Sequence, residues 1–126
     1  MSALNSNTAS LISIAEKWFE AFNIQSIEHL LSLYADDAEH FSPRLQKNHP
    51  ETNGVIKGKA AMRDWWQSSF DKMPSLNYEC LNLKVENDII FMKYSRSVDG
   101  EKDIIVNEML QIKDNKIIFS KVIPAE

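Results

Sequence analysis

Glu108 is the first residue whose surroundings in the sequence suggest chemistry. It lies in the segment 106–112, VNEMLQI, which reads as a β-strand. Because side chains alternate between the two faces of a strand, its same-face neighbours are Val106, Leu110 and Ile112. A carboxyl group among apolar neighbours is desolvated, which raises its pKa and suits it to act as a general acid.

His40 is the second candidate, and it precedes Ser42 by two positions in the segment EHFSP. On a strand, both side chains would point to the same face. A histidine titrates near neutral pH, so His40 could act as a general base or activate Ser42. The alternative is a partly exposed strand histidine bonded to solvent or backbone. A serine and a histidine at this spacing rarely reach the geometry of a hydrolase triad.

The elements that must position these residues fall into a helical first half and a strand-rich second half. Apolar residues at steps of three and four predict helices, and turn signals such as Asp99-Gly100 separate strands. The expected helices are 10–22, 26–34 and 59–73; the expected strands are 38–44, 76–86, 89–98, 101–113 and 116–123, with a loop over 45–57. This order predicts an α+β fold with helices on one face of an antiparallel sheet.

The registers of the hairpins decide what lies next to Glu108. A two-residue Asp99-Gly100 turn would pair Phe91 with Glu108 and Arg96 with Asp103. A two-residue turn at 114–115 would place Lys121 opposite Glu108, with Lys93 diagonal to it, whereas a three-residue turn would place Val122 there. Glu108 is therefore either a member of a structural ion pair or a pocket carboxyl.

The same alternation makes both faces of the sheet partly apolar. The helices can cover only one face, so a second copy of the chain is expected to cover the other, giving a homodimer.

Composition excludes several classes of function. The chain has 126 residues, 44% hydrophobic and 25% charged, as in one globular domain, with a flexible tail expected over 1–9 and the domain over 10–126. One cysteine and three scattered histidines predict no metal and no cofactor. A net charge of −4 argues against nucleic-acid binding, and the absence of a long apolar run or basic leader predicts a cytoplasmic protein without a membrane span.

The segments AFNIQSIEHLLSLYADDAEHFSP and GKAAMRDWWQSSF are followed by a predicted four-stranded meander. This order, over about residues 10–123, resembles the nuclear transport factor 2-like superfamily, in its SnoaL-like and ketosteroid-isomerase-like branch. The resemblance implies a cone-shaped α+β barrel with a curved sheet around an apolar pocket, usually in a homodimer. Fold alone does not assign function, because this superfamily includes isomerases, cyclases, hydrolases, dehydratases and binding proteins.

The resemblance also assigns positions. The aspartate that serves as general base in ketosteroid isomerases falls on Ser42, which is a poor base. Two tyrosines of that family fall on Trp18 and Trp66, and its partner acid falls on Glu108. Steroid-isomerase chemistry therefore lacks its proton carrier here.

Two functions remain open at this point. One is a non-catalytic domain that binds a small apolar or amphipathic ligand. The other is a cofactor-free acid–base enzyme, of isomerase, cyclase, dehydratase or hydrolase type, that uses His40 and Glu108. The residues expected to line the pocket in either case are Trp18, Ser42, Trp66, Phe91 and Leu110.

Overall fold

A computed structural model describes residues 3–124 of the chain, with side chains described from residue 8. Its helices are α1 (Ala3–Asn23), α2 (Ile27–Ser32), α3 (Pro43–Asn48), the short 3-10 helix η1 (Pro50–Thr52) and α4 (Lys59–Lys72). Its strands are β1 (Tyr34–Phe41), β2 (Val55–Lys57), β3 (Asn77–Glu86), β4 (Ile89–Ser97), β5 (Ile104–Lys113) and β6 (Lys116–Ile123).

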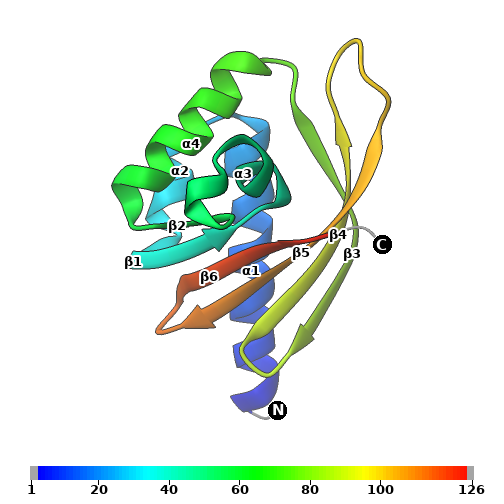
Figure 1. The fold of residues 1–126 in the computed structure, drawn as a ribbon. Helices are drawn as coiled ribbons and strands as arrows, with labels where there is room; N and C mark the ends of the chain where they lie inside the picture. The colour runs from blue at the N-terminus through cyan, green and yellow to red at the C-terminus, as the bar shows by residue number, and fades with distance from the viewer. Residues whose placement is uncertain (1–2, 125–126) are drawn as a thin grey trace.

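The strands form one curved sheet, and the helices cover one face of it (Figure 1). The six strands lie in the order β2-β1-β6-β5-β4-β3, and only β1 and β6 pair in parallel. The long helix α1 packs inside the curve against β3, and α4 lies beside β1 and β2. This is the α+β arrangement that the sequence predicts, with the sheet curved into a cone.

Helix α1 is held by the apolar stripe that predicts it. Leu11, Ala15, Trp18 and Phe22 recur on one face and are all buried. The helix begins at Ala3, so residues 3–9 of the expected flexible tail are helical, and residues 1–2 lie outside the described part of the chain.

The segment 45–57, expected to be a loop, contains α3, η1 and β2 instead. Ser42 ends β1 and caps α3, because its hydroxyl accepts a hydrogen bond from the Arg44 amide at 3.1 Å. Pro43 occupies the first turn, where a missing amide hydrogen costs nothing. The proline therefore starts a short helix as well as ending a strand.

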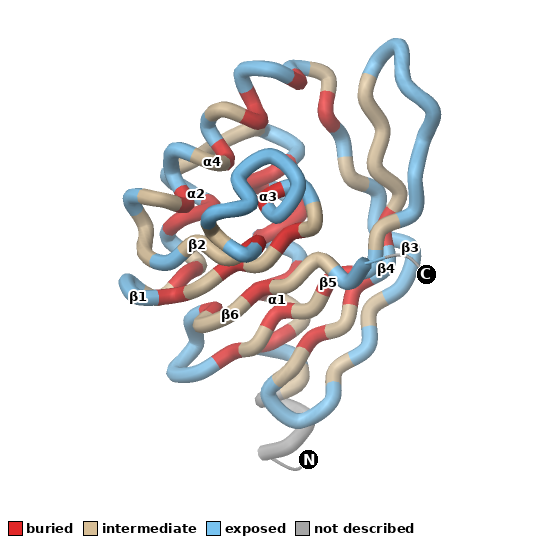
Figure 2. Tube along the Cα trace, in the orientation of Figure 1, coloured by how far each residue is buried: buried red, intermediate tan, exposed pale blue. Residues whose placement is uncertain are grey.

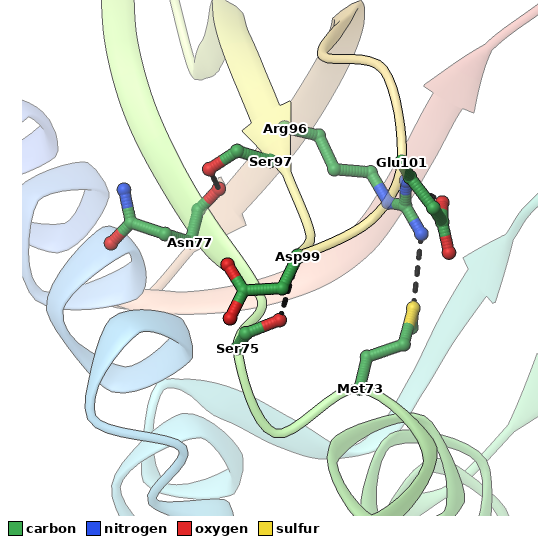
Figure 3. A network of polar contacts seen from close by, with 7 residues as sticks. All are labelled: Met73, Ser75, Asn77, Arg96, Ser97, Asp99 and Glu101. Atoms are coloured by element: carbon green, nitrogen blue, oxygen red, sulfur yellow. Dashed lines mark hydrogen bonds and ion pairs between the residues drawn. The ribbon is translucent and has the colours of Figure 1, made fainter.

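The β4–β5 hairpin is longer than the expected two-residue turn. Residues 98–103 connect the strands, so Met92 pairs with Glu108 and Phe91 pairs with Met109. Figure 3 shows how this connection is held: the Asp99 amide donates to Ser75 Oγ at 2.8 Å, and Arg96 reaches Glu101 at 3.4 Å rather than Asp103. The predicted register was thus wrong by one residue, which moves Phe91 to the outer face of the sheet.

The β5–β6 hairpin combines the two alternatives. Asp114 and Asn115 have φ values of 52° and 62°, the left-handed geometry of a two-residue turn. An irregularity between Gln111 and Ile112 then shifts the pairing, so Val122 lies opposite Glu108 and Lys121 lies opposite Met109. Among the described residues, no lysine pairs with Glu108, so the ion-pair alternative is wrong.

The buried side chains gather between the helices and the inner face of the sheet (Figure 2). The outer face is less covered: Ile105 is 56% exposed and Ile123 is 39% exposed. None of the described helices is long and apolar enough to cross a membrane.

Candidate functional site

A cavity of about 280 Å³ opens between the helices and the inner face of the sheet. This volume lies just below the usual range for small-molecule sites, roughly 300–1,000 Å³. Its lining comes from α1, α4, the start of α3 and the strands β1, β3, β4, β5 and β6. The lining residues are Phe22, His40, Ser42, Pro43, Arg44, Trp65, Trp66, Ser69, Met73, Leu76, Tyr78, Tyr94, Arg96, Ile104, Val106, Glu108 and Val122.

Aromatic rings form much of the cavity wall. The rings of Tyr78 and Tyr94 lie 4.4 Å apart between centroids, and Phe22 packs edge-on against Trp66 at 5.9 Å. Such walls favour a flat apolar ligand, because ring faces and edges give specific stacking geometries as well as apolar contact.

His40 is held by a chain of buried hydrogen bonds that begins at Trp18. The indole nitrogen of Trp18 donates to Tyr34 Oη at 3.2 Å, and Tyr34 donates to Ser120 Oγ at 3.0 Å. Ser120 Oγ lies 2.6 Å from His40 Nδ1. Trp18 can only donate, whereas the hydroxyl groups of Tyr34 and Ser120 can both donate and accept, so the tautomer of His40 sets the direction of the bond between Ser120 Oγ and Nδ1.

This chain holds the imidazole in place. His40 is buried and lines the cavity, and its Nδ1 is hydrogen-bonded to Ser120 Oγ. Burial lowers the pKa of His40 to about 3, although a hydrogen bond with the Ser120 backbone acts in the opposite direction. His40 is therefore neutral at physiological pH, and its lowered pKa makes it a weaker base than a solvent-exposed histidine.

Glu108 is the buried acid of the cavity, with 2% of its surface exposed. Tyr94 donates a hydrogen bond to its Oε1 at 2.7 Å. Burial raises the pKa of Glu108 to about 7, while the bond from Tyr94 acts to lower it. Near neutral pH the carboxyl is thus divided between its acid and its base form, as general acid–base chemistry requires.

Of the residues that the sequence singled out, four line this cavity: His40, Ser42, Trp66 and Glu108. His40 lies on β1, Ser42 directly follows β1, Trp66 lies on α4 and Glu108 lies on β5. Ser42 also caps α3, and His40 bonds to Ser120, so the expected pairing of His40 with Ser42 does not form.

The other three lie elsewhere. Trp18 is fully buried behind the cavity as the first donor of the chain to His40, and Leu110 is fully buried in the core. Phe91 lies on the outer face of the sheet. It was expected in the pocket because the predicted β4–β5 register was wrong by one residue.

Sequence reasoning missed the tyrosines and arginines of the cavity. Tyr94 and Arg96 share the inner face with Met92, but the predicted register placed that face opposite to Glu108. Arg44 was missed because the capping signal Ser42-Pro43, which starts α3, was read as the end of a strand. The capping signal can be read from the sequence, whereas the register depends on contacts between segments that are distant in sequence.

Two further features bear on the site. A groove of about 800 Å³ lies between α1, α2 and the β5–β6 turn, but it is open to solvent and has polar walls without a buried acid or base. In the part of the chain that the structure describes, no three His, Cys, Asp or Glu side chains converge as metal ligands.

The comparisons with known proteins agree with this fold. A family model described as a SnoaL-like domain matches residues 15–119. No curated protein sequence matches the chain closely enough to serve as a relative.

Solved structures share the fold. A SnoaL-like protein of unknown function from Burkholderia thailandensis superposes with a TM-score of 0.82 at 21% identity, over 94% of this chain and 97% of that one. A provisionally assigned polyketide cyclase from Sinorhizobium meliloti gives 0.75 at 19% identity, over 88% and 94%. TerC, co-crystallised with polyporic acid, gives 0.79 at 16% identity, over 92% of each chain.

Proposed function

The chain belongs to the family of SnoaL-like domains, and from this premise we propose that it binds a small apolar or amphipathic compound in the cavity above Glu108. The observation that carries the proposal is the cavity itself: about 280 Å³, walled by aromatic side chains and containing a few buried polar groups. This combination is typical of small-molecule sites. The likeness to TerC, which was co-crystallised with polyporic acid, supports an aromatic ligand.

The polar groups at the wall would orient such a ligand. The imidazole of His40 offers a hydrogen-bond donor or acceptor, according to its tautomer, and the free oxygen of Glu108 offers an acceptor or, when protonated, a donor. A ligand with a carbonyl or hydroxyl group would satisfy both. Because these groups are held by Ser120 and Tyr94, they need little reordering on binding.

A calorimetric titration tests the binding role. The probe is 2-naphthamide, a flat neutral compound, and we expect saturable binding at one site per chain. Val106→Phe should abolish binding because the larger ring fills the cavity. Ile105→Phe, at the next residue on the outer face of the sheet, should bind as the wild type does. The absence of saturable binding, or equal binding by Val106→Phe, would refute the proposal.

A second candidate, acid–base catalysis, is favoured by one observation: Glu108 has a pKa of about 7 inside an apolar cavity. In its base form, the carboxylate could remove a proton from a carbon beside a carbonyl group and return it, with His40 donating to the enolate oxygen. Ser42 has no part in such a step, since it caps α3.

Proton exchange at a ketone tests the catalytic role. In deuterated water, 2-tetralone exchanges its α-hydrogens for deuterium, and nuclear magnetic resonance follows the rate. Catalysis by the protein should rise with pH through about 7 and disappear in Glu108→Gln. Unchanged exchange in that variant would exclude Glu108 as the base.

A further inference from the structure

Two guanidinium groups lie at the cavity, and neither of the functions above uses them. Arg96 enters from β4 and Arg44 from the first turn of α3. The Arg96 side chain is only 15% exposed, whereas Arg44 is exposed, so Arg44 marks the mouth of the cavity and Arg96 lies further in. Both line the same space as the aromatic walls.

The two arginines share a neighbour inside the cavity. The pKa of Tyr78 is raised by burial and by Glu108, and the positive charges of Arg96 and Arg44 both act to lower it. Both charges are therefore close enough to act on the same phenol. Tyr78 also pairs with Arg96 across β3 and β4, so the two residues lie opposite each other on neighbouring strands.

The protein itself leaves this positive charge incompletely neutralised. Glu101 contacts Arg96 at 3.4 Å, but its own side chain is 54% exposed (Figure 3). The other contact of Arg96 is the neutral sulfur of Met73, at 3.0 Å. Arg44 has no carboxylate partner among the described residues; its guanidinium lies 5.7 Å from the centre of the Trp65 ring. A ring face is a weaker partner for a cation than an anion is.

Building on the proposed function, we propose that the ligand is a flat aromatic acid whose carboxylate binds between Arg44 and Arg96 while its rings occupy the cavity. The ligand carboxylate would lie apart from the Glu108 carboxyl group, because Glu108 is buried deep in the cavity whereas Arg44 is exposed at its mouth. The planar guanidinium fork matches the two oxygens of a carboxylate. Stacking on Trp65 leaves the N–H edge of Arg44 free to bind such a group.

The test compares two probes of the same shape, 2-naphthoic acid and 2-naphthamide, by calorimetry at neutral pH. We expect the acid to bind about tenfold more tightly than the amide, since a charge-assisted hydrogen bond is stronger than a neutral one. Arg44→Met and Arg96→Met should each reduce this preference. Glu101→Gln should increase it, because the competing carboxylate is removed from Arg96.

Controls separate this inference from the proposed function. Arg63→Met removes an arginine of the same helical layer that pairs with Glu28 and does not line the cavity, so the preference should stay. Arg96→Lys keeps the charge if Arg96→Met does not fold. If the amide binds as tightly as the acid, or if the preference survives in both arginine variants, the inference is wrong while the proposed function stands. If neither probe binds, both fail.

Discussion

Glu108 and His40 show how one cavity shifts two side chains toward their neutral forms. Burial raises the pKa of Glu108 from 4.5 to about 7 and lowers that of His40 from 6.5 to about 3. Between pH 4.5 and 6.5 the folded protein keeps a proton on Glu108 that the unfolded chain has lost. In the same range, the unfolded chain carries a proton on His40 that the folded protein lacks. The two linkage effects therefore oppose each other.

Removing Glu108 should reveal the contribution of its buried carboxyl. Because the pKa of this acid is raised on folding, its stabilising effect is complete below pH 4.5 and is lost as pH rises toward 7. The free energy of unfolding of Glu108→Gln, relative to wild type, should therefore increase over that interval, by an amount on the order of 3 kcal/mol. Urea denaturation across the pH range measures it. A difference that does not change with pH would show that Glu108 titrates normally.

The effect of replacing His40 on the free energy of unfolding should have the opposite pH dependence. Since its pKa is lowered on folding, its contribution to stability is present above pH 6.5 and is lost as pH falls toward 3. His40→Asn keeps an acceptor near Ser120 but does not titrate, so its stability relative to wild type should rise as the solution is acidified. The same denaturation series checks this. If the variant instead loses stability relative to wild type in acid, the histidine is charged in the folded protein.

At the scale of elements, local signals predict which helices and strands form but not how the strands align. The apolar stripe of α1 and the turn at Asp114-Asn115 are local, and both occur in the structure. The β4–β5 register depends on residues 98–103 meeting Ser75 and on the contacts of Arg96, which are distant in sequence. A one-residue shift exchanges the two faces of a strand, so Tyr94 and Arg96 were missed at the site while Phe91 was included.

The loop that follows α3 depends on a glycine, which gives an expectation at this scale. Gly54 has φ +84°, and a Cβ there would lie 2.6 Å from the ring of Phe41. Its carbonyl also accepts a hydrogen bond from the Ser42 amide at 3.0 Å, which joins the loop to the end of β1. Gly54→Ala should therefore destabilise the fold through both backbone strain and a clash.

Gly100→Ala is the matched control, because Gly100 has φ +82° and no atom within 4 Å of the added Cβ. It should cost about 1 kcal/mol for the left-handed backbone alone. Gly54→Ala should cost more by roughly 1–3 kcal/mol, the usual range for overpacking. Thermal and urea unfolding give both values. Equal losses would mean that the Phe41 ring moves aside freely and that the predicted clash does not occur.

At the scale of the whole molecule, the cone has one covered face and one open face. The helices cover the inner face, where the cavity lies, and the outer face of β4, β5 and β6 presents Phe91, Ile105, Met109, Phe119 and Ile123. Ile105 and Ile123 are exposed, and the others are half-buried. An apolar sheet face of this kind is usually covered by another surface.

We expect a second copy of the chain to cover that face, so sedimentation equilibrium at micromolar concentration should give a mass near twice 14.5 kDa. Ile105→Glu places a charge on the outer face and should return the protein to a monomer, because burying an unpaired carboxylate is costly. Ile24→Glu is the control: Ile24 is 57% exposed, as Ile105 is at 56%, but it follows α1 and lies off the sheet. A monomeric wild type, or equal effects of the two substitutions, would mean that the apolar outer face does not pair two chains.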